Sequence, residues 1–426
     1  MRVVLMSSWA LFMGMFLLQL GNGVQSTLLG IRGDIEGFSA AQMSLVMSAY
    51  FLGFLGGSRL TPGLIRRVGH VRVFAALASF VSAIMILYPV LTDPISWSLL
   101  RILIGFCFSG VYVTAESWLN NSATNETRGM SLGIYMIVQM AGVTLAQYML
   151  NFGDVGGFVL FIIPSVLVSI SFAPILLSIT PTPPFETAKP MSLRELFAAS
   201  PLGCVGMFLM GGVFAAFFGM SAVYGTTAGF TVAQITVFVS AFYFGGLVFQ
   251  FPIGWLSDRI DRRILILGSA GGAAVCSFLA VGFSEVFPIL VGLAALIGGL
   301  SNPLYALLIA YTNDYLELDD MASASGGLVF VNGLGAISGP LVAGALIQYS
   351  GPSGYFVFLG TVLAAISIYA LYRMRQRPMT TDAEELVSYA QVLPTSTAVA
   401  VEAAQEYYAE NVDEEEQTGT IREGTA

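Results

Sequence analysis

The sequence predicts an all-α membrane protein in which twelve transmembrane helices form two pseudo-symmetric six-helix bundles. Three observations support this prediction. Of the 426 residues, 56% are hydrophobic and 10% are charged, a balance far too apolar for a soluble domain. Apolar runs of roughly 20 residues, the length that a helix needs to cross a bilayer, recur along the chain. The first half of the chain is also repeated in the second half.

The repeat is clearest where residues 37–71 are aligned with residues 229–263 without a gap. Identical residues in the two stretches include the glycine, alanine and glutamine of the shared pattern Gly-Phe-x-x-Ala-Gln. A second match pairs residues 119–142 with residues 316–339, after an insertion of five residues. The chain is therefore expected to consist of two halves with the same architecture.

The apolar runs are unbroken, whereas barrel strands alternate polar and apolar residues over about ten positions, so a helical bundle is predicted. The first run lacks a small-x-small cleavage site and is expected to be a helix and not a signal peptide. The first six helices are expected at residues 7–30, 42–64, 71–91, 95–119, 129–150 and 157–179. The second six are expected at residues 201–226, 233–256, 264–283, 287–311, 323–348 and 355–372.

Basic residues indicate the orientation of these helices. They gather at the two termini and in alternate loops, while the opposite loops contain Arg32 alone. Since Lys and Arg favour the cytoplasmic side of short loops, both termini are expected in the cytoplasm.

Four segments follow from this organisation: bundles at residues 1–179 and 201–377, a cytoplasmic linker at residues 180–200, and a tail at residues 378–426. The linker contains four prolines, and Ser192 and Glu195 have the spacing of a capping box. This spacing predicts a short helix on the membrane surface, with an irregular loop as the alternative. The tail has eleven acidic residues and one basic residue, so it is expected to be solvated and disordered. A partner-binding or regulatory role for residues 402–416 stays open.

The loop that ends the repeated stretch resembles a known family. Residues 254–263, Gly-Trp-Leu-Ser-Asp-Arg-Ile-Asp-Arg-Arg, resemble the G-x-L-x-D-R-x-G-R-R signature of the major facilitator superfamily (MFS). The first copy is degenerate, with Pro62 in the glycine position and Arg66 in the aspartate position. The resemblance implies a secondary transporter that works by alternating access on a small-molecule substrate and needs no cofactor. Residues 66–72, 116–120 and 311–314 also resemble the YcaD-like permeases, and this resemblance implies a protein of the bacterial inner membrane.

Two charged residues lie within the fourth apolar run. Arg101 and Gly105 resemble the R-x-x-x-G element that the family associates with proton coupling, and an arginine inside a bilayer normally faces a cavity or a partner. Arg101 is therefore expected to act in coupling, with protons as the coupled ion. The alternative is that it reaches the outer surface or bonds a backbone carbonyl of the first helix. Glu116 lies fifteen residues further on, about 22 Å away along a helix, so the two side chains cannot pair. Glu116 is expected to pair with loop arginines, and a role as proton carrier is the alternative.

The motif loops are expected to form latches at the cytoplasmic gate. In the family the loop aspartate can bind the start of a helix in the other half, because a helix N-terminus is positive. Asp258 would then face Arg128, while Arg66 and Arg67 would face Asp319 and Asp320 in a swapped pairing, unless these are merely solvated loop charges. The gating residues expected are Arg66, Arg67, Arg128, Asp258, Arg259, Arg262, Asp314, Asp319 and Asp320.

Polar side chains inside apolar helices are candidates for a substrate path. On the first helix the spacing of three places Gln19, Asn22 and Gln25 on one stripe. The candidates are Gln19, Asn22, Gln25, Tyr135, Gln139, Tyr243, Gln250, Asn302, Tyr305 and Asn332. Each alone could instead be a hydrogen-bonding contact between helices. Amides and phenols outnumber carboxylates, which favours a neutral or anionic solute.

Other functions remain as alternatives. Met136, Met140 and Phe217 could line the wall of a multidrug exporter. A transporter-like sensor that signals through the acidic tail is a second class. Enzymatic chemistry is not expected, because His70 is the one histidine and is placed in a loop, and Lys189 is the one lysine. No metal, disulfide or nucleic-acid partner is expected, and the protein is expected to be a monomer. The Gly335-x-x-x-Gly339-Pro340 motif resembles an efflux element, but its small residues also suit close helix packing.

Overall fold

The structure is a computed structural model that describes residues 2–122, 125–177, 191–316, 318–376, 392, 396–401 and 404. Side chains at 2–7, 121–122, 125–129, 318–319 and 322 lie outside this description. The expected linker prolines, most of the acidic tail, and the side chains of Arg128 and Asp319 therefore fall outside it. Within the described part of the chain every regular element is a helix.

The N-terminal half contains six transmembrane segments, one of them in two pieces. Its helices are α1 (Arg2–Ile35), α2 (Ala40–Val68), α3 (His70–Leu87), α4 (Pro94–Ser122), α5 (Asn125–Met149), the 3-10 turn η1 (Leu150–Phe152), α6 (Val159–Ser171) and α7 (Ala173–Leu177). The break between α6 and α7 lies beside Pro174, which has no backbone N–H to donate to the preceding turn.

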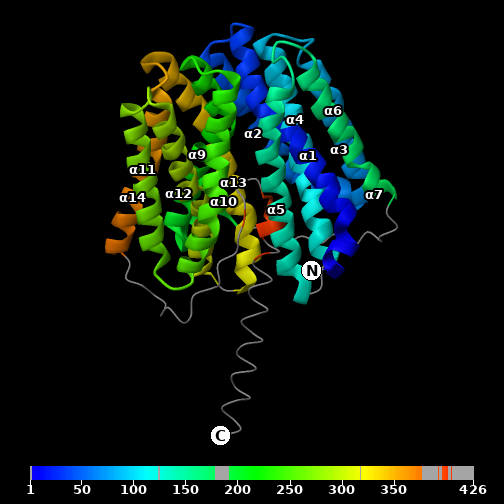
Figure 1. Cartoon of the computed structure of the whole chain (residues 1–426). Coiled ribbons are helices and arrows are strands. Elements are labelled where there is room, and N and C mark those ends of the chain that lie inside the picture. The colour runs from blue at the N-terminus through cyan, green and yellow to red at the C-terminus, as the bar shows by residue number, and fades with distance from the viewer. Residues whose placement is uncertain are drawn as a thin grey trace.

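The C-terminal half begins with the short helix α8 and continues with six long helices. They are α8 (Leu193–Ala199), α9 (Pro201–Thr227), α10 (Val232–Ser257), α11 (Arg262–Gly282), α12 (Phe287–Asn313), α13 (Leu318–Ser350) and α14 (Gly354–Gln376). Eleven spans in the described chain are long and apolar enough to cross a membrane, and α1 adds a helix of 34 residues. The expected twelve-helix fold in two bundles is confirmed, and Figure 1 shows the two halves beside each other.

The repeat in the sequence corresponds to a repeat in local structure. Gly37 and Gly229 both adopt a φ of 77°, a left-handed conformation that favours glycine. Each is followed by a capping box that starts the next helix, formed by Ser39 and Gln42 before α2 and by Thr231 and Gln234 before α10.

Close helix packing is repeated as well. A Cβ on Gly53 of α2 would lie 1.9 Å from the backbone oxygen of Ile102 on α4. At the equivalent place, a Cβ on Gly245 of α10 would lie 1.8 Å from the backbone oxygen of Ala295 on α12. Neither distance is possible for a real side chain, so both helix pairs require glycine where they cross.

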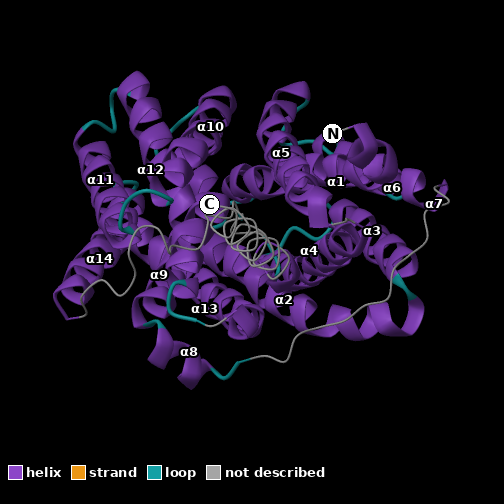
Figure 2. Cartoon of the chain, turned by 90° about the horizontal axis from the view of Figure 1, so that it is seen from below, coloured by secondary structure: helices purple, strands orange, loops and turns teal. Residues whose placement is uncertain are grey.

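We call the end with the α2–α3 and α10–α11 loops the inner end and the opposite end the outer end. The halves meet tightly toward the outer end, where Ser48 of α2 donates to the backbone oxygen of Ile337 on α13. A Cβ on Gly344 of α13 would lie 2.3 Å from the Cβ of Ser44. Figure 2 views the inner end, with α1–α7 on one side and α9–α14 on the other.

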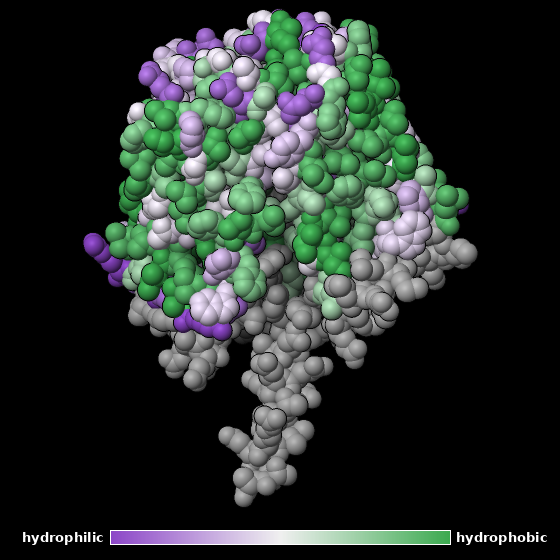
Figure 3. Space-filling model, in the orientation of Figure 1, coloured by the Kyte–Doolittle hydropathy of each residue, from purple (hydrophilic) through white to green (hydrophobic). Residues whose placement is uncertain are grey.

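The surface and the linker helix fit a membrane protein. Hydrophobic residues cover most of the face in Figure 3, and hydrophilic residues gather near its upper end and along its lower edge. Helix α8 begins with the expected capping box between Ser192 and Glu195. Its buried Leu196 packs against Gly327 of α13, so the prediction of a short helix here is confirmed.

Eight described residues of the tail differ from the expected solvated segment. Six of them, Val392, Ser396, Thr397, Ala400, Val401 and Ala404, are buried in the protein. In Figure 1 the short red helical segment lies between the two halves.

Candidate functional site

A central cavity lies where the two halves meet. Three predicted path residues, Asn22, Tyr243 and Asn332, line it, and so does Arg101. The remaining lining residues are Gly23, Ser26, Tyr50, Phe51, Phe54, Leu55 and Val143 from the first half, Phe214, Phe218, Gly219, Val329, Gly333 and Ala336 from the second, and Ser396 from the tail. The cavity therefore has walls from both bundles.

Arg101 is the one charged side chain among these described lining residues. It is 2% exposed, and its guanidinium lies 4.9 Å from the ring centre of Tyr50. Its Nη1 and Nη2 atoms donate over 3.4 Å to Gln25 and Ser26 of α1, while its Nε is buried without a hydrogen-bond partner among the described residues. Its partners are thus neutral, and part of its hydrogen-bonding capacity is unused.

The predicted stripe on α1 divides into two roles. Asn22 faces the cavity and donates to the Tyr112 hydroxyl over 2.9 Å. Behind it, the Tyr112 hydroxyl donates to Gln19 over 2.8 Å, and Gln19 donates to Gln139 of α5 over 2.7 Å. Gln19 and Gln139 therefore join helices α1, α4 and α5, whereas Gln25 supports Arg101.

Four other predicted path residues lie away from the central cavity. Asn302 packs against Gly246 at the crossing of α10 and α12, and Tyr305 is fully buried in α12. Tyr135 donates from its hydroxyl to Glu116 over 3.2 Å. Gln250 lines a separate groove between α5 and α10, together with Met136, Met140 and Val392 of the tail.

The sequence analysis missed the aromatic walls of the cavity. Phe214 and Phe218 lie on neighbouring turns of α9 with ring centres 4.3 Å apart and ring planes tilted by 52°. The ring centre of Phe218 lies 5.4 Å from that of Tyr243. The repeat could have indicated Phe51, because the alignment of the halves pairs it with the predicted path residue Tyr243. Both residues line the cavity.

Glu116 does not pair with loop arginines as expected. Its carboxylate is fully buried and accepts from the backbone N–H of Thr397 over 3.0 Å and from the Thr397 hydroxyl. The expected arrangement failed because the tail returns to the bundle and brings these donors to it.

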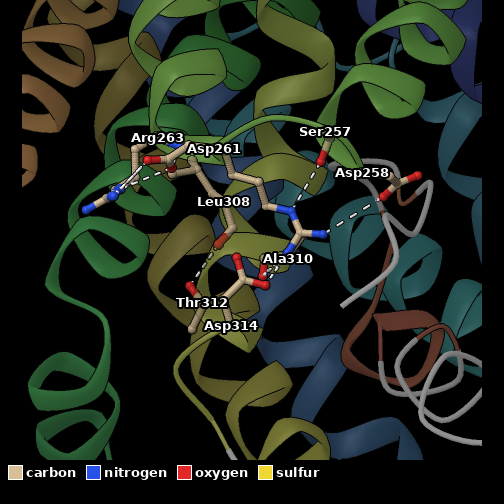
Figure 4. Close-up of polar contacts among 9 residues, drawn as sticks. Ser257, Asp258, Asp261, Arg263, Leu308, Ala310, Thr312 and Asp314 are labelled. Atoms are coloured by element: carbon tan, nitrogen blue, oxygen red, sulfur yellow. Dashed lines mark hydrogen bonds and ion pairs between the residues drawn. The ribbon is translucent and has the colours of Figure 1, made fainter. Parts of the chain in front are cut away.

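A buried ion pair anchors the inner corner of the second half (Figure 4). Arg262 at the start of α11 is 1% exposed and pairs with Asp314 at the end of α12. It also donates to Ser257 over 3.2 Å and to the backbone oxygen of Ala310 over 3.3 Å. Asp258 lies 3.9 Å from the same guanidinium with its side chain 40% exposed. Arg262 and Asp314 therefore join two helices of one half.

The inner corner of the first half has a neutral contact at the same place. His70 is not in a loop as expected: it begins α3, is 2% exposed, and its Nε2 lies 2.7 Å from the Ser117 hydroxyl of α4. Arg66 and Arg67 are exposed, as is Asp320.

Arg259, the remaining gating candidate, lies with its guanidinium 4.0 Å from the ring centre of Trp255. The described residues of the α2–α3 and α10–α11 loops do not test the predicted latches, which therefore stay a hypothesis.

A second cavity, which we call the inner cavity, opens toward the inner end. It adjoins the central cavity, because Leu55 and Val329 line both. Its other residues are Ser58, Arg59, Pro62, Arg66, Val113, Met191, Leu193, Ser323, Gly326, Gly327, Phe330, Thr397, Ala398 and Val399. Within the described chain, no cluster of His, Cys, Asp and Glu could hold a metal ion.

Comparison with known proteins settles the family. The family model of the Major Facilitator Superfamily matches residues 11–240 and 202–402. The chain belongs to this superfamily. It is 26% identical to the uncharacterized MFS-type transporter YfkF of Bacillus subtilis over 353 residues, 81% of this chain and 89% of YfkF. It is also 26% identical to the uncharacterized MFS-type transporter YcaD of Escherichia fergusonii over 377 residues, 87% of this chain and 96% of that protein.

Solved structures show the same fold. The nucleoside transporter NupG matches with a TM-score of 0.71 and 15% identity, over 88% of this MFS chain and 99% of NupG. A bacterial homologue of the human lysosomal transporter Spinster, in an inward-facing and unoccupied conformation, matches with a TM-score of 0.66 and 15% identity, over 96% and 98% of the two chains. The predictions of an MFS fold and of a membrane transporter, not an enzyme, are confirmed.

Proposed function

We propose that this MFS protein is a secondary active transporter that moves a small organic solute by alternating access, with the solute bound in the central cavity. The observation that supports this best is the cavity itself, which is lined by both halves where they meet. A solute in that position contacts both bundles, so a rocking motion of one against the other can expose it to either side.

The residues of the cavity favour a neutral or anionic solute with an apolar part. Arg101 supplies a positive charge, and the described lining residues include no carboxylate that would attract a cation. Asn22, Tyr243 and Asn332 offer hydrogen bonds, while Phe51, Phe54, Phe214 and Phe218 offer aromatic surface. An anion would pair with the unused donor capacity of Arg101.

Transport is proposed to be coupled to protons through Arg101 and Glu116. Both side chains are buried in α4. Arg101 lines the central cavity, and Glu116 bonds Thr397, which lines the inner cavity. Buried ionisable groups within membrane helices commonly mark ion pathways, which supports their assignment.

We place the protein in the bacterial inner membrane as a monomer with both termini in the cytoplasm. The curated relatives quoted above are bacterial proteins. Arg66, Arg67, Arg262 and Arg263 gather at the inner end, whereas Arg32, in the last turn of α1, is the one basic residue at the outer end of the described chain. This bias favours a cytoplasmic inner end.

A ligand screen followed by flux measurement tests the proposal. Purified protein is screened by thermal shift against organic acids, sugars, amino acids and drugs, and hits are tested for uptake into proteoliposomes with a pH gradient. We expect an organic acid or a neutral solute to stabilise the protein and to be transported. A ligand that binds without being moved would indicate a sensor, and stabilisation by cationic drugs alone would contradict the proposed solute class.

The coupling role is tested with Arg101→Ala and the charge-preserving Arg101→Lys. We expect Arg101→Ala to abolish gradient-driven flux while expression stays near normal, because the cavity then loses its charge. Arg101→Lys keeps the charge but not the fork of donors and should retain partial flux. Full proton-driven flux in Arg101→Ala would refute the coupling role.

A further inference from the structure

The inner opening of the substrate path is occupied by the chain's own tail. We call residues Val392, Ser396–Val401 and Ala404 the tail segment. Ser396 lines the central cavity, and Thr397, Ala398 and Val399 line the inner cavity between α2 and α13. Val392 lies in the groove between α5 and α10. Described residues of the tail segment therefore lie at both places where helices of the two halves face each other, α2 with α13 and α5 with α10.

The tail segment is packed closely against the protein. Val401 is 0% exposed and Ala400 is 1% exposed, so small apolar side chains fill the space between the bundles. Glu402 is the only charged residue in the stretch 392–404, although acidic residues are frequent on either side of it. A stretch this poor in charge can enter the apolar passage without burying several carboxylates.

Glu116 supplies a specific docking contact. A fully buried carboxylate requires hydrogen-bond donors, and the tail provides the backbone N–H and the hydroxyl of Thr397. The remaining donor in the described chain is the Tyr135 hydroxyl. Most of the hydrogen bonds that satisfy Glu116 therefore exist only while the tail is in place.

The connection is long enough for this return. Helix α14 ends at Gln376, and fifteen residues, 377–391, precede Val392. A chain of that length can span up to about 50 Å, which is ample to reach the space between the halves from the inner end of α14.

We propose that the tail segment is an autoinhibitory plug, which docks on Glu116 in the inner opening and closes the central cavity to water and solute from that side. Opening the path then requires the tail to leave. The rocking motion of the two halves is also hindered while the segment lies between them.

Accessibility of a reporter cysteine tests the plug without any transported solute. Val329→Cys, in a background where Cys107, Cys204 and Cys276 are replaced by alanine, places a thiol where the central and inner cavities meet. Its reaction with a membrane-impermeant maleimide is timed in purified full-length protein and after deletion of residues 379–426. The matched control deletes only residues 405–426, which removes the acidic end and keeps the docked segment.

We expect the deletion of residues 379–426 to speed labelling by about tenfold or more, since a plug docked nine-tenths of the time leaves about a tenth of the molecules open. The shorter deletion should react at the full-length rate. A synthetic peptide of residues 390–404 should slow the fast variant again. Equal rates for the full-length protein and the long deletion, or equal acceleration by both deletions, would overturn the proposal.

A point variant keeps the test valid if the deletion impairs folding. Val401→Asp places a carboxylate at a fully buried position and should release the plug, giving fast labelling in a chain of full length. Val401→Ile preserves the apolar contact and should label slowly. Because this assay needs no solute, its result is independent of the flux measurements, and slow labelling of a monodisperse Val401→Asp protein would contradict the plug.

Discussion

The two inner corners of the molecule share a geometry and differ in charge. The repeat pairs His70 with Arg262, and the second match, extended by two residues at its start, pairs Ser117 with Asp314. In the first half the contact is a hydrogen bond of 2.7 Å between neutral groups, and in the second half it is a buried ion pair (Figure 4). In both halves the residue that starts the third helix of the bundle binds the end of the fourth.

This difference shows which features the duplicated scaffold holds constant. Glycines at the helix crossings keep the backbones in the same places, so two side chains meet at each corner whatever their chemistry. The charge of the meeting pair is then free to change, provided that both members change together. A buried charge left alone would be costly, whereas a matched neutral pair is not.

The largest effect is expected from removing one member of the ion pair. Asp314→Ala leaves the guanidinium of Arg262, 1% exposed, without this carboxylate, and should destabilise the protein by about 3–5 kcal/mol. Thermal or denaturant unfolding of the purified protein in detergent measures the loss. A loss no greater than that of the neutral-corner variant Ser117→Ala would show that the ion pair is not the stronger anchor.

Converting the charged corner into a copy of the neutral one should be milder. Arg262→His combined with Asp314→Ser removes both charges and restores a histidine–serine contact, so we expect it to regain about 2 kcal/mol relative to Asp314→Ala. The same unfolding assay applies. A double variant as unstable as Asp314→Ala would mean that the corners are not interchangeable.

A smaller effect is expected in the first half. Ser117→Ala removes the hydroxyl that lies 2.7 Å from His70 and should cost about 1 kcal/mol, the usual net value of one hydrogen bond. Ser117→Thr, which keeps a hydroxyl, is the matched control and should lose less. Equal losses for the two variants would assign the effect to packing and not to the hydrogen bond.

The smallest effect on stability is expected at Asp258. It lies 3.9 Å from Arg262 with a side chain 40% exposed, so Asp258→Asn should change the free energy of unfolding by only about 0–1 kcal/mol. If Asp258 acts as a latch, the same variant should shift the population toward the open inner end. Spin-label distances across the inner end measure this shift, and an unchanged distribution would leave the latch without support.

The fold class and the resemblance to the family could be predicted from the amino-acid sequence alone. Composition and run length identify membrane helices, because only helices and closed barrels satisfy backbone polar groups in lipid. The repeat predicted two halves, and it also contained the pairing of Phe51 with Tyr243 and of His70 with Arg262. Asn22, Arg101, Tyr243 and Asn332 could be predicted for the cavity because a polar side chain in an apolar helix requires a cavity or a partner.

Only the folded structure shows which polar residues line a cavity and which bond a partner on a neighbouring helix. Gln19 and Gln139 are, like Asn22, amide side chains in apolar helices. They nevertheless hydrogen-bond to each other behind the cavity wall. Helical spacing gives the face of one helix but not the neighbour that the face meets.

The position of the tail was likewise beyond the sequence. Its net charge predicts solvation, whereas the short stretch poor in charge lies against Glu116 in the space between the bundles. Composition averages over a segment, but burial is decided residue by residue by the shape of the site that receives it. For Thr397 and Val401 that site is made of helices far away in the sequence, and only the folded chain brings them together.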